Sequence, residues 1–287
     1  MNTKTSSTPH HSPLSVPIDP SIRRAYADLR EGQIHYATCG PASAPAVLLL
    51  HQTPRSWREY ATVLPLLGKR YRAIAMDTVG FGDSMAPPWE PSIERWAAAA
   101  VAFLEAIGVE QVHVVGHHTG GVIAVELAAL APDKVRSLVL SSSPFVDAAG
   151  RALREKRPAI DVVEPSQDGS HLQALWGRRQ PFYPVGRPDL LQAFVLDAIR
   201  VSGDPEEGHR VVARYVMEER IGLVRQPTLI VRATADPYAS PEAEHLRAKI
   251  PGARIVDIEG GMVPLPDQEP VAFAKAVEAF LDEQGQP

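Results

Sequence analysis

Strand-like stretches that alternate with helix-like stretches are the feature that most constrains how this chain of 287 residues can fold. Several of them, such as AVLLL and YRAIAM, are continuous apolar runs, which is typical of strands buried on both faces. The predicted strands lie at residues 33–38, 46–50, 71–76, 112–115, 135–140, 227–232 and 253–258. The predicted helices lie at residues 92–107, 121–130, 241–250 and 271–281. This alternation predicts an α/β fold with a mostly parallel central sheet and helices on both faces.

The alternation is interrupted between residues 145 and 217. Helix-like pieces such as residues 189–200 occur there, broken by Pro and Gly, but no buried strand. We therefore expect one α/β domain, residues 25–144 and 218–287, with a helical insertion between its two parts. Residues 1–24 are polar and rich in Pro, and we expect them to form a flexible tail.

Composition excludes several classes of protein. The net charge of -5, from 34 acidic and 29 basic side chains, argues against nucleic acid as a partner. No apolar run approaches the ~20 residues of a membrane span, and the first residues lack the apolar centre of a signal peptide. The single cysteine, Cys39, excludes an intramolecular disulfide and a Cys-rich zinc site. We expect a cytoplasmic protein, monomer or homodimer, that acts on a small molecule away from membranes.

The sequence VHVVGHHTGG at residues 112–121 predicts a strand, a sharp turn and a helix. Its frame, Gly116-His-His-Thr-Gly120, has the spacing of the G-x-S-x-G elbow, in which the middle residue is exposed above the sheet. In this chain the middle residue is His118. At this point the chain resembles the α/β-hydrolase superfamily.

Three more stretches carry the same resemblance, which covers residues 25–284. HQTP at residues 51–54 resembles the H-G-x-P turn, and DTVGFGDS at residues 77–84 resembles D-x-x-G-x-G-x-S. Asp236 follows a predicted strand where the family keeps its catalytic acid. The resemblance implies an α/β-hydrolase fold, with residues 145–217 as its helical cap and the site beneath that cap at the carboxyl ends of the strands.

Three positions depart from the family pattern, and one of them is Gln52, where the H-G-x-P turn has Gly. His118 stands where the family has Ser, Asp or Cys, and Met262, in GGMVP at residues 260–264, stands where the family has its catalytic His. No histidine follows His245, so the usual Ser-His-Asp triad cannot be assembled. The resemblance thus implies a non-standard site.

An imidazole at the elbow is long enough to reach across the space of the missing histidine. We expect His118 to hydrogen-bond to Asp236 and to act as a general base that activates water or takes a proton from the substrate. Direct attack through an acyl-imidazole stays open. The resemblance places the oxyanion hole at the N–H groups of Gln52, Thr53 and Thr119.

Four further residues are candidates for contact with the substrate. They are Arg55, His171, Trp176 and Met262, of which Arg55 would bind a carboxylate through its planar fork. No metal-ligand pattern, Walker loop or dinucleotide-binding turn occurs, so we expect neither a metal nor a cofactor.

The predicted function is cofactor-independent hydrolysis of an ester, lactone or similar carbonyl compound, with a small and mostly apolar substrate. Two alternatives stay open. One is a lyase-type reaction at the same site, such as C–C cleavage, decarboxylation, elimination or cyclisation. The other is a ligand-binding protein without catalytic activity.

Overall fold

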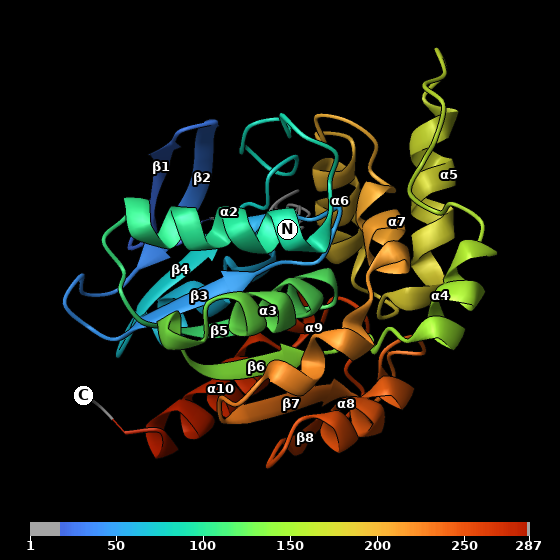
Figure 1. The fold of residues 1–287 in the computed structure, drawn as a ribbon. Helices are drawn as coiled ribbons and strands as arrows, with labels where there is room; N and C mark the ends of the chain where they lie inside the picture. Colours follow the sequence, from blue (N-terminus) through green and yellow to red (C-terminus); the bar gives the residue numbers. More distant parts are fainter. Residues whose placement is uncertain (1–17, 286–287) are drawn as a thin grey trace, which may run out of the picture.

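A computed structural model describes residues 18–285 of the chain (Figure 1). Most of the predicted tail, residues 1–17, lies outside the described residues. The predicted tail extends too far, to residue 24, because strand β1 (Arg23–Leu29) begins at residue 23 and Ile22 is already buried. The sequence RRAYADL holds no continuous apolar run, since this strand lies at the edge of the sheet with much of its surface exposed.

The described residues form one eight-stranded sheet in the order β1-β2-β4-β3-β5-β6-β7-β8. Strand β2 is antiparallel to β1 and β4, and all the other pairs are parallel. After β1 the strands are β2 (Gly32–Cys39), β3 (Ala46–Leu50), β4 (Arg72–Met76), β5 (Val112–His117), β6 (Val135–Ser141), β7 (Thr228–Ala233) and β8 (Arg254–Ile258). The predicted α/β class, with a mostly parallel sheet, is confirmed.

Ten α-helices connect or flank these strands in the described part of the chain. They are α1 (Val63–Leu67), α2 (Ile93–Ala106), α3 (Thr119–Leu130), α4 (Ala148–Glu155), α5 (Ser170–Arg179), α6 (Pro188–Ala198), α7 (Glu207–Arg214), α8 (Ala243–Lys249), α9 (Leu265–Gln268) and α10 (Pro270–Glu283). Helix α2 begins where the sequence predicts, because the Ser92 side chain accepts a hydrogen bond from the Arg95 backbone N–H at 3.2 Å. None of the helices in residues 18–285 combines the length and the apolar character needed to cross a membrane.

The central strands are apolar on both faces because helices cover both. In β3, Leu48 and Leu50 belong to the core that packs under α2, α3 and α8, whereas Val47 and Leu49 belong to the core under α1 and α10. All four side chains are 0% exposed, so a strand with alternating apolar and polar residues would bury its polar side chains here. The two cores therefore account for the continuous apolar runs in the sequence.

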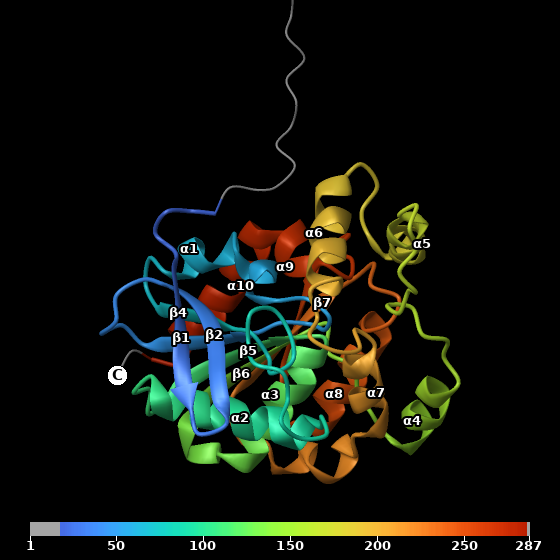
Figure 2. The same ribbon diagram turned by 90° about the horizontal axis from the view of Figure 1, so that it is seen from above.

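The segment between β6 and β7 contains α4 to α7, and residues 145–217 hold no strand. We call residues 145–217 the helical insertion. Figure 1 shows its helices gathered at one end of the sheet, and Figure 2 shows them from above. It has a small apolar cluster of its own, formed by Leu175, Tyr183, Leu190, Leu191, Phe194, Val195 and Ala198.

A glycine brings the insertion close to the core. Gly208, at the start of α7, lies so near Thr53, in the loop after β3, that a Cβ atom at residue 208 would collide with the threonine hydroxyl. Both residues are buried. The close contact of α7 with this loop therefore requires glycine.

Replacing Gly208→Ala should lower the free energy of unfolding by about 1–3 kcal/mol, because α7 must move away from Thr53. Gly177→Ala is a matched control, since residue 177 is exposed within α5 and a Cβ atom there meets nothing within 4 Å. That change should stabilise the protein by up to about 1 kcal/mol. Equilibrium urea unfolding measures both, and equal effects of the two substitutions would contradict this account.

Candidate active site

The turn between β5 and α3 aims His118 away from the sheet. Its backbone has a φ of 47°, in the left-handed region that side-chain-bearing residues seldom adopt. The turn is tight because α3 approaches β3, and a Cβ atom at Gly120 would collide with the Leu50 carbonyl oxygen. Close packing behind the turn thus holds His118 in a strained conformation.

His118 lies against Asp236, which follows β7. Nε2 of the ring is 2.8 Å from Oδ2 of the carboxylate, with side-chain exposures of 16% and 0%. The two atoms are not aligned as in a regular hydrogen bond, yet neither has another partner among the described residues. Nδ1 is therefore the ring nitrogen left to face the cavity.

Two backbone groups fix the Asp236 carboxylate. Oδ1 accepts hydrogen bonds from the N–H groups of Tyr238 at 2.9 Å and Ala239 at 3.1 Å, which leaves Oδ2 for His118. Burial favours the neutral acid, but the His118 ring and the two N–H groups outweigh it and hold the pKa of Asp236 below its usual value. Asp236 is thus a carboxylate that can orient the ring and balance a charge on it.

His117, the neighbour of His118, is held inside the protein by two hydrogen bonds. The Val263 carbonyl can only accept, so Nε2 of His117 donates to it at 2.8 Å, and Nδ1 accepts from the Ser141 hydroxyl at 2.9 Å. Burial, with repulsion by His118, lowers the pKa of His117 to about 3. His117 is therefore neutral and ties the loop after β8 to the turn that carries His118.

The three oxyanion candidates differ in what their N–H groups do. The Gln52 N–H donates to Glu59 Oε2 at 2.9 Å, and the Gln52 side chain donates to Oε1 of the same carboxyl group at 2.6 Å. Thr53 and Thr119 meet through their hydroxyl groups at 3.0 Å, and within residues 18–285 their backbone N–H groups have no partner. The geometry therefore favours Thr53 and Thr119 over Gln52 as donors.

Arg55 lies outside the cavity wall, in a cluster of buried charges. Its side chain is 0% exposed, and it contacts Asp197 of α6 through Nε and Asp267 of α9 through Nη2, both at 2.8 Å. Glu59 Oε1 is 4.0 Å from Nη1. One guanidinium cannot neutralise three carboxyl groups, and burial raises the pKa of Asp267 to about 6 and that of Glu59 to about 8. Arg55 is thus occupied inside the protein instead of facing a substrate.

The other three predicted substrate contacts also lie outside the cavity wall. The backbone N–H of Ser166 donates to His171 Nδ1 at 3.1 Å, and Trp176 packs on the apolar cluster of the insertion. The Met262 N–H donates to Gln268 Oε1 at 2.7 Å, and its neighbour Val263 lines the cavity instead. The structure does not bring these three side chains to His118.

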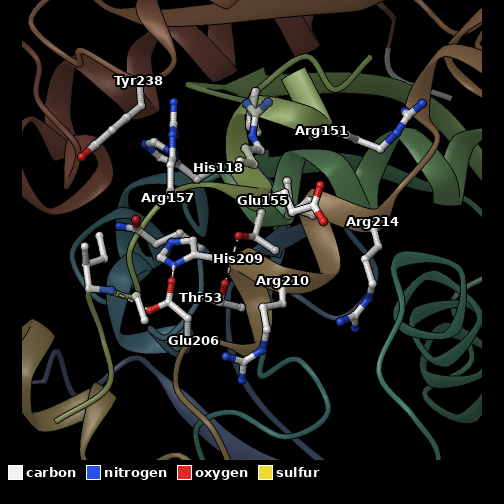
Figure 3. A pocket seen from close by; sticks show the side chains of 18 of the residues that line it. Thr53, His118, Arg151, Glu155, Arg157, Glu206, His209, Arg210, Arg214 and Tyr238 are labelled. Atoms are coloured by element: carbon white, nitrogen blue, oxygen red, sulfur yellow. Dashed lines mark hydrogen bonds and ion pairs between the residues drawn. The ribbon is translucent and has the colours of Figure 1, made fainter. Parts of the chain in front are cut away.

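The cavity beside His118 has a volume of about 970 Å³ and lies between the core and the insertion. Figure 3 shows the charged side chains around it. Its wall includes Gln52, Thr53, His118, Thr119, Tyr238 and Val263 from the core, and Arg151, Arg154, Glu155, Arg157, Arg179, Glu206, His209, Arg210 and Arg214 from the insertion. These arginines were not predicted as site residues, although the spacing of three between Arg151, Arg154 and Arg157 is visible in the sequence.

His209 of α7 lines the cavity. Its Nδ1 lies 2.9 Å from Glu206 Oε1 and 3.5 Å from Asp161 Oδ2. These three side chains are close enough together to hold a metal ion. However, the Arg179 guanidinium already binds one of the three, because its Nε lies 2.7 Å from Asp161 Oδ1. The positive charge beside this cluster is therefore supplied by an arginine of the protein itself.

A family model described as alpha/beta hydrolase fold matches residues 45–203. The chain belongs to this family. Solved structures agree in fold: the enol-lactonase from Burkholderia xenovorans LB400 has a TM-score of 0.76 at 21% identity, covering 90% of this chain and 100% of that one.

Curated relatives include several hydrolases. Mouse bifunctional epoxide hydrolase 2 is 32% identical over 140 residues, which are 47% of this chain and 25% of that protein. The chain thus matches only about a quarter of the length of this relative. The putative carbamate hydrolase RutD of Pseudomonas syringae pv. syringae (strain B728a) is 27% identical over 257 residues, which are 87% of this chain and 98% of that protein.

The low pKa of His117 makes stability depend on pH. The unfolded state takes up a proton at this residue near pH 6.5, whereas the folded state stays neutral down to about pH 3. The free energy of unfolding should therefore fall as the pH is lowered through this window. In a His117→Gln variant this contribution is missing.

The advantage of wild type over His117→Gln should shrink by roughly 2–4 kcal/mol between pH 7 and pH 4, as measured by urea unfolding at several pH values. His245→Gln is the matched control, because the His245 side chain is 65% exposed. A constant difference between wild type and His117→Gln across this range would show that His117 is not held neutral.

Proposed function

We propose that this chain is a cofactor-independent hydrolase of an ester, lactone or similar carbonyl substrate, in which a His118–Asp236 dyad replaces the family's usual triad. The observation that carries the proposal is the 2.8 Å contact between His118 Nε2 and Asp236 Oδ2 beside a large cavity. His118 takes the place of the nucleophile at the elbow, and Met262 that of the catalytic histidine. The elbow imidazole thus supplies the base that Met262 cannot.

The chemistry follows from the protonation state of the dyad. With the proton on Nε2, beside the carboxylate, the lone pair on Nδ1 is free to accept a proton from water. The water oxygen forms a bond to the carbonyl carbon, and the carbonyl oxygen takes up the negative charge. Collapse of this intermediate breaks the bond to the leaving oxygen, which receives the proton from Nδ1. The negative Asp236 stabilises the imidazolium that forms between these steps.

The oxyanion is best served by the N–H groups of Thr53 and Thr119. The two residues touch through their hydroxyl groups, both are buried, and neither N–H has another partner in the described chain. Donors already in place need no rearrangement when charge develops on the carbonyl oxygen. The names of the relatives, which include epoxide hydrolases and a putative carbamate hydrolase, support hydrolysis as the reaction type.

The first test compares wild type with His118→Ala and Asp236→Asn on activated esters, lactones, carbamates, epoxides and β-keto acids. Loss of the base should lower kcat by about 10²–10⁴-fold in His118→Ala. Asp236→Asn should lower kcat by a smaller factor, because the base is still present. His245→Ala, which changes an exposed histidine, is the control and should keep wild-type turnover. Equal rates in wild type and His118→Ala would remove His118 from the mechanism, and turnover of β-keto acids alone would point to a lyase.

A further inference from the structure

We propose that Arg154 and Arg157 form an anion-binding subsite in the wall of the His118 cavity, and that the substrate carries a carboxylate besides its reacting carbonyl group. The reading of this cavity as the reaction site rests on the proposed function. The subsite itself follows from the charges and contacts along the cavity wall. It also changes the expected substrate, because a mostly apolar molecule would leave these cations without a partner.

The cavity wall has an excess of positive charge in a protein of negative charge. Six arginines line it, against two glutamates, whereas the whole chain has a net charge of -5. Positive charge gathered in a cleft between low-dielectric walls attracts anions and raises their local concentration. The distribution of charge thus favours an anionic ligand at this place.

Four of these arginines already have carboxylate partners. Arg151 Nη2 lies 2.6 Å from Glu218 Oε1, and Arg214 Nη2 lies 2.8 Å from Glu207 Oε1. The remaining two of the four are Arg179, which binds Asp161, and Arg210, which binds Asp204 and Glu207. These side chains brace the insertion, and their charge is largely balanced within the protein.

Arg154 and Arg157 differ from the other four. Within residues 18–285 neither has a carboxylate oxygen within the 4.0 Å of an ion pair, and they lie on or just after α4. Burial and repulsion by Arg157 lower the pKa of Arg154, and the more distant Glu242 and Asp147 only partly offset this. Two guanidinium groups that repel each other gain most from one shared anion.

The subsite is connected to the catalytic dyad. The Arg157 guanidinium carbon lies 5.3 Å from the centre of the Tyr238 ring, on which it stacks. The backbone N–H of Tyr238 in turn donates to Asp236 Oδ1 at 2.9 Å. Tyr238, His118 and both arginines line the same cavity. Figure 3 shows Arg157 there with Tyr238 and His118. One small molecule can therefore place its carboxylate on the arginines and its carbonyl group at His118.

A carboxylate suits this pair chemically. The planar guanidinium group donates two parallel hydrogen bonds to the two oxygens of a carboxylate, and such charge-assisted bonds are strong. A volume of about 970 Å³ leaves room for a substrate with separate reacting and anchoring ends. The inferred substrate class is the ester or lactone of an organic acid that keeps one free carboxylate.

The kinetic test uses two p-nitrophenyl esters of similar length, the neutral butyrate and the anionic hemisuccinate. Wild type should favour the hemisuccinate in kcat/KM by about tenfold to hundredfold. A variant carrying Arg154→Gln and Arg157→Gln should lose this preference, mainly through a higher KM for the hemisuccinate. Arg214→Gln removes a paired arginine from the same wall and should keep the preference. Retention of the preference by the double variant would overturn the subsite.

A binding test separates the subsite from catalysis. Titration calorimetry with succinate and with uncharged succinamide should show binding of succinate alone by wild type, at least tenfold weakened in the double variant and kept in His118→Ala. Equal binding of both compounds, or unchanged succinate binding in the double variant, would overturn the subsite. Arginine-dependent succinate binding without hydrolysis of either ester would overturn the proposed function but support the subsite. Hydrolysis of both esters without a charge preference would support the proposed function but overturn the subsite.

Discussion

The close approach of α3 to β3 at Gly120 is the constraint on which the candidate site depends. It leaves no room for a side chain at residue 120, and it forces the chain at His118 into a turn with a φ of 47°. Such a conformation is costly and persists only where packing on all sides imposes it. The apolar strands on either side, 0% exposed over most of their length, supply that packing. The core therefore determines the direction of the imidazole.

The second constraint is the buried group of charges around Arg55. It joins the loop after β3 to Asp197 in the insertion and to Asp267 after β8, so three separate parts of the sequence meet at one guanidinium. A buried ion pair adds little to stability overall, but removal of one partner is costly. This arrangement fixes the insertion relative to the core. Arg55 thus has a structural role beside the oxyanion turn.

Much of the fold could be predicted from the sequence, because buried parallel strands require continuous apolar runs. The elbow at His118 and the partner position of Asp236 could be predicted too, since both follow strands whose ends meet at the same edge of the sheet. The edge strand β1 was missed because its outer face needs no apolar residues. Arg55, His171, Trp176 and Met262 were assigned to a cavity from which the structure separates them, because the direction of a loop or insertion side chain depends on contacts distant in sequence.

The charge of the cavity wall could not be predicted from the sequence either. Whether an arginine is balanced depends on carboxylates that approach from other elements, such as Glu218 for Arg151, and no local pattern reveals this. The spacing of three on α4 places Arg151 and Arg154 on one side of a helix, but only the fold distinguishes the paired side chain from the unpaired one. Neither Arg154 nor Arg157 has a carboxylate partner within the described residues, although both line a cavity rich in positive charge. Arg154 and Arg157 are therefore the part of this cavity best explained by the substrate rather than by the fold.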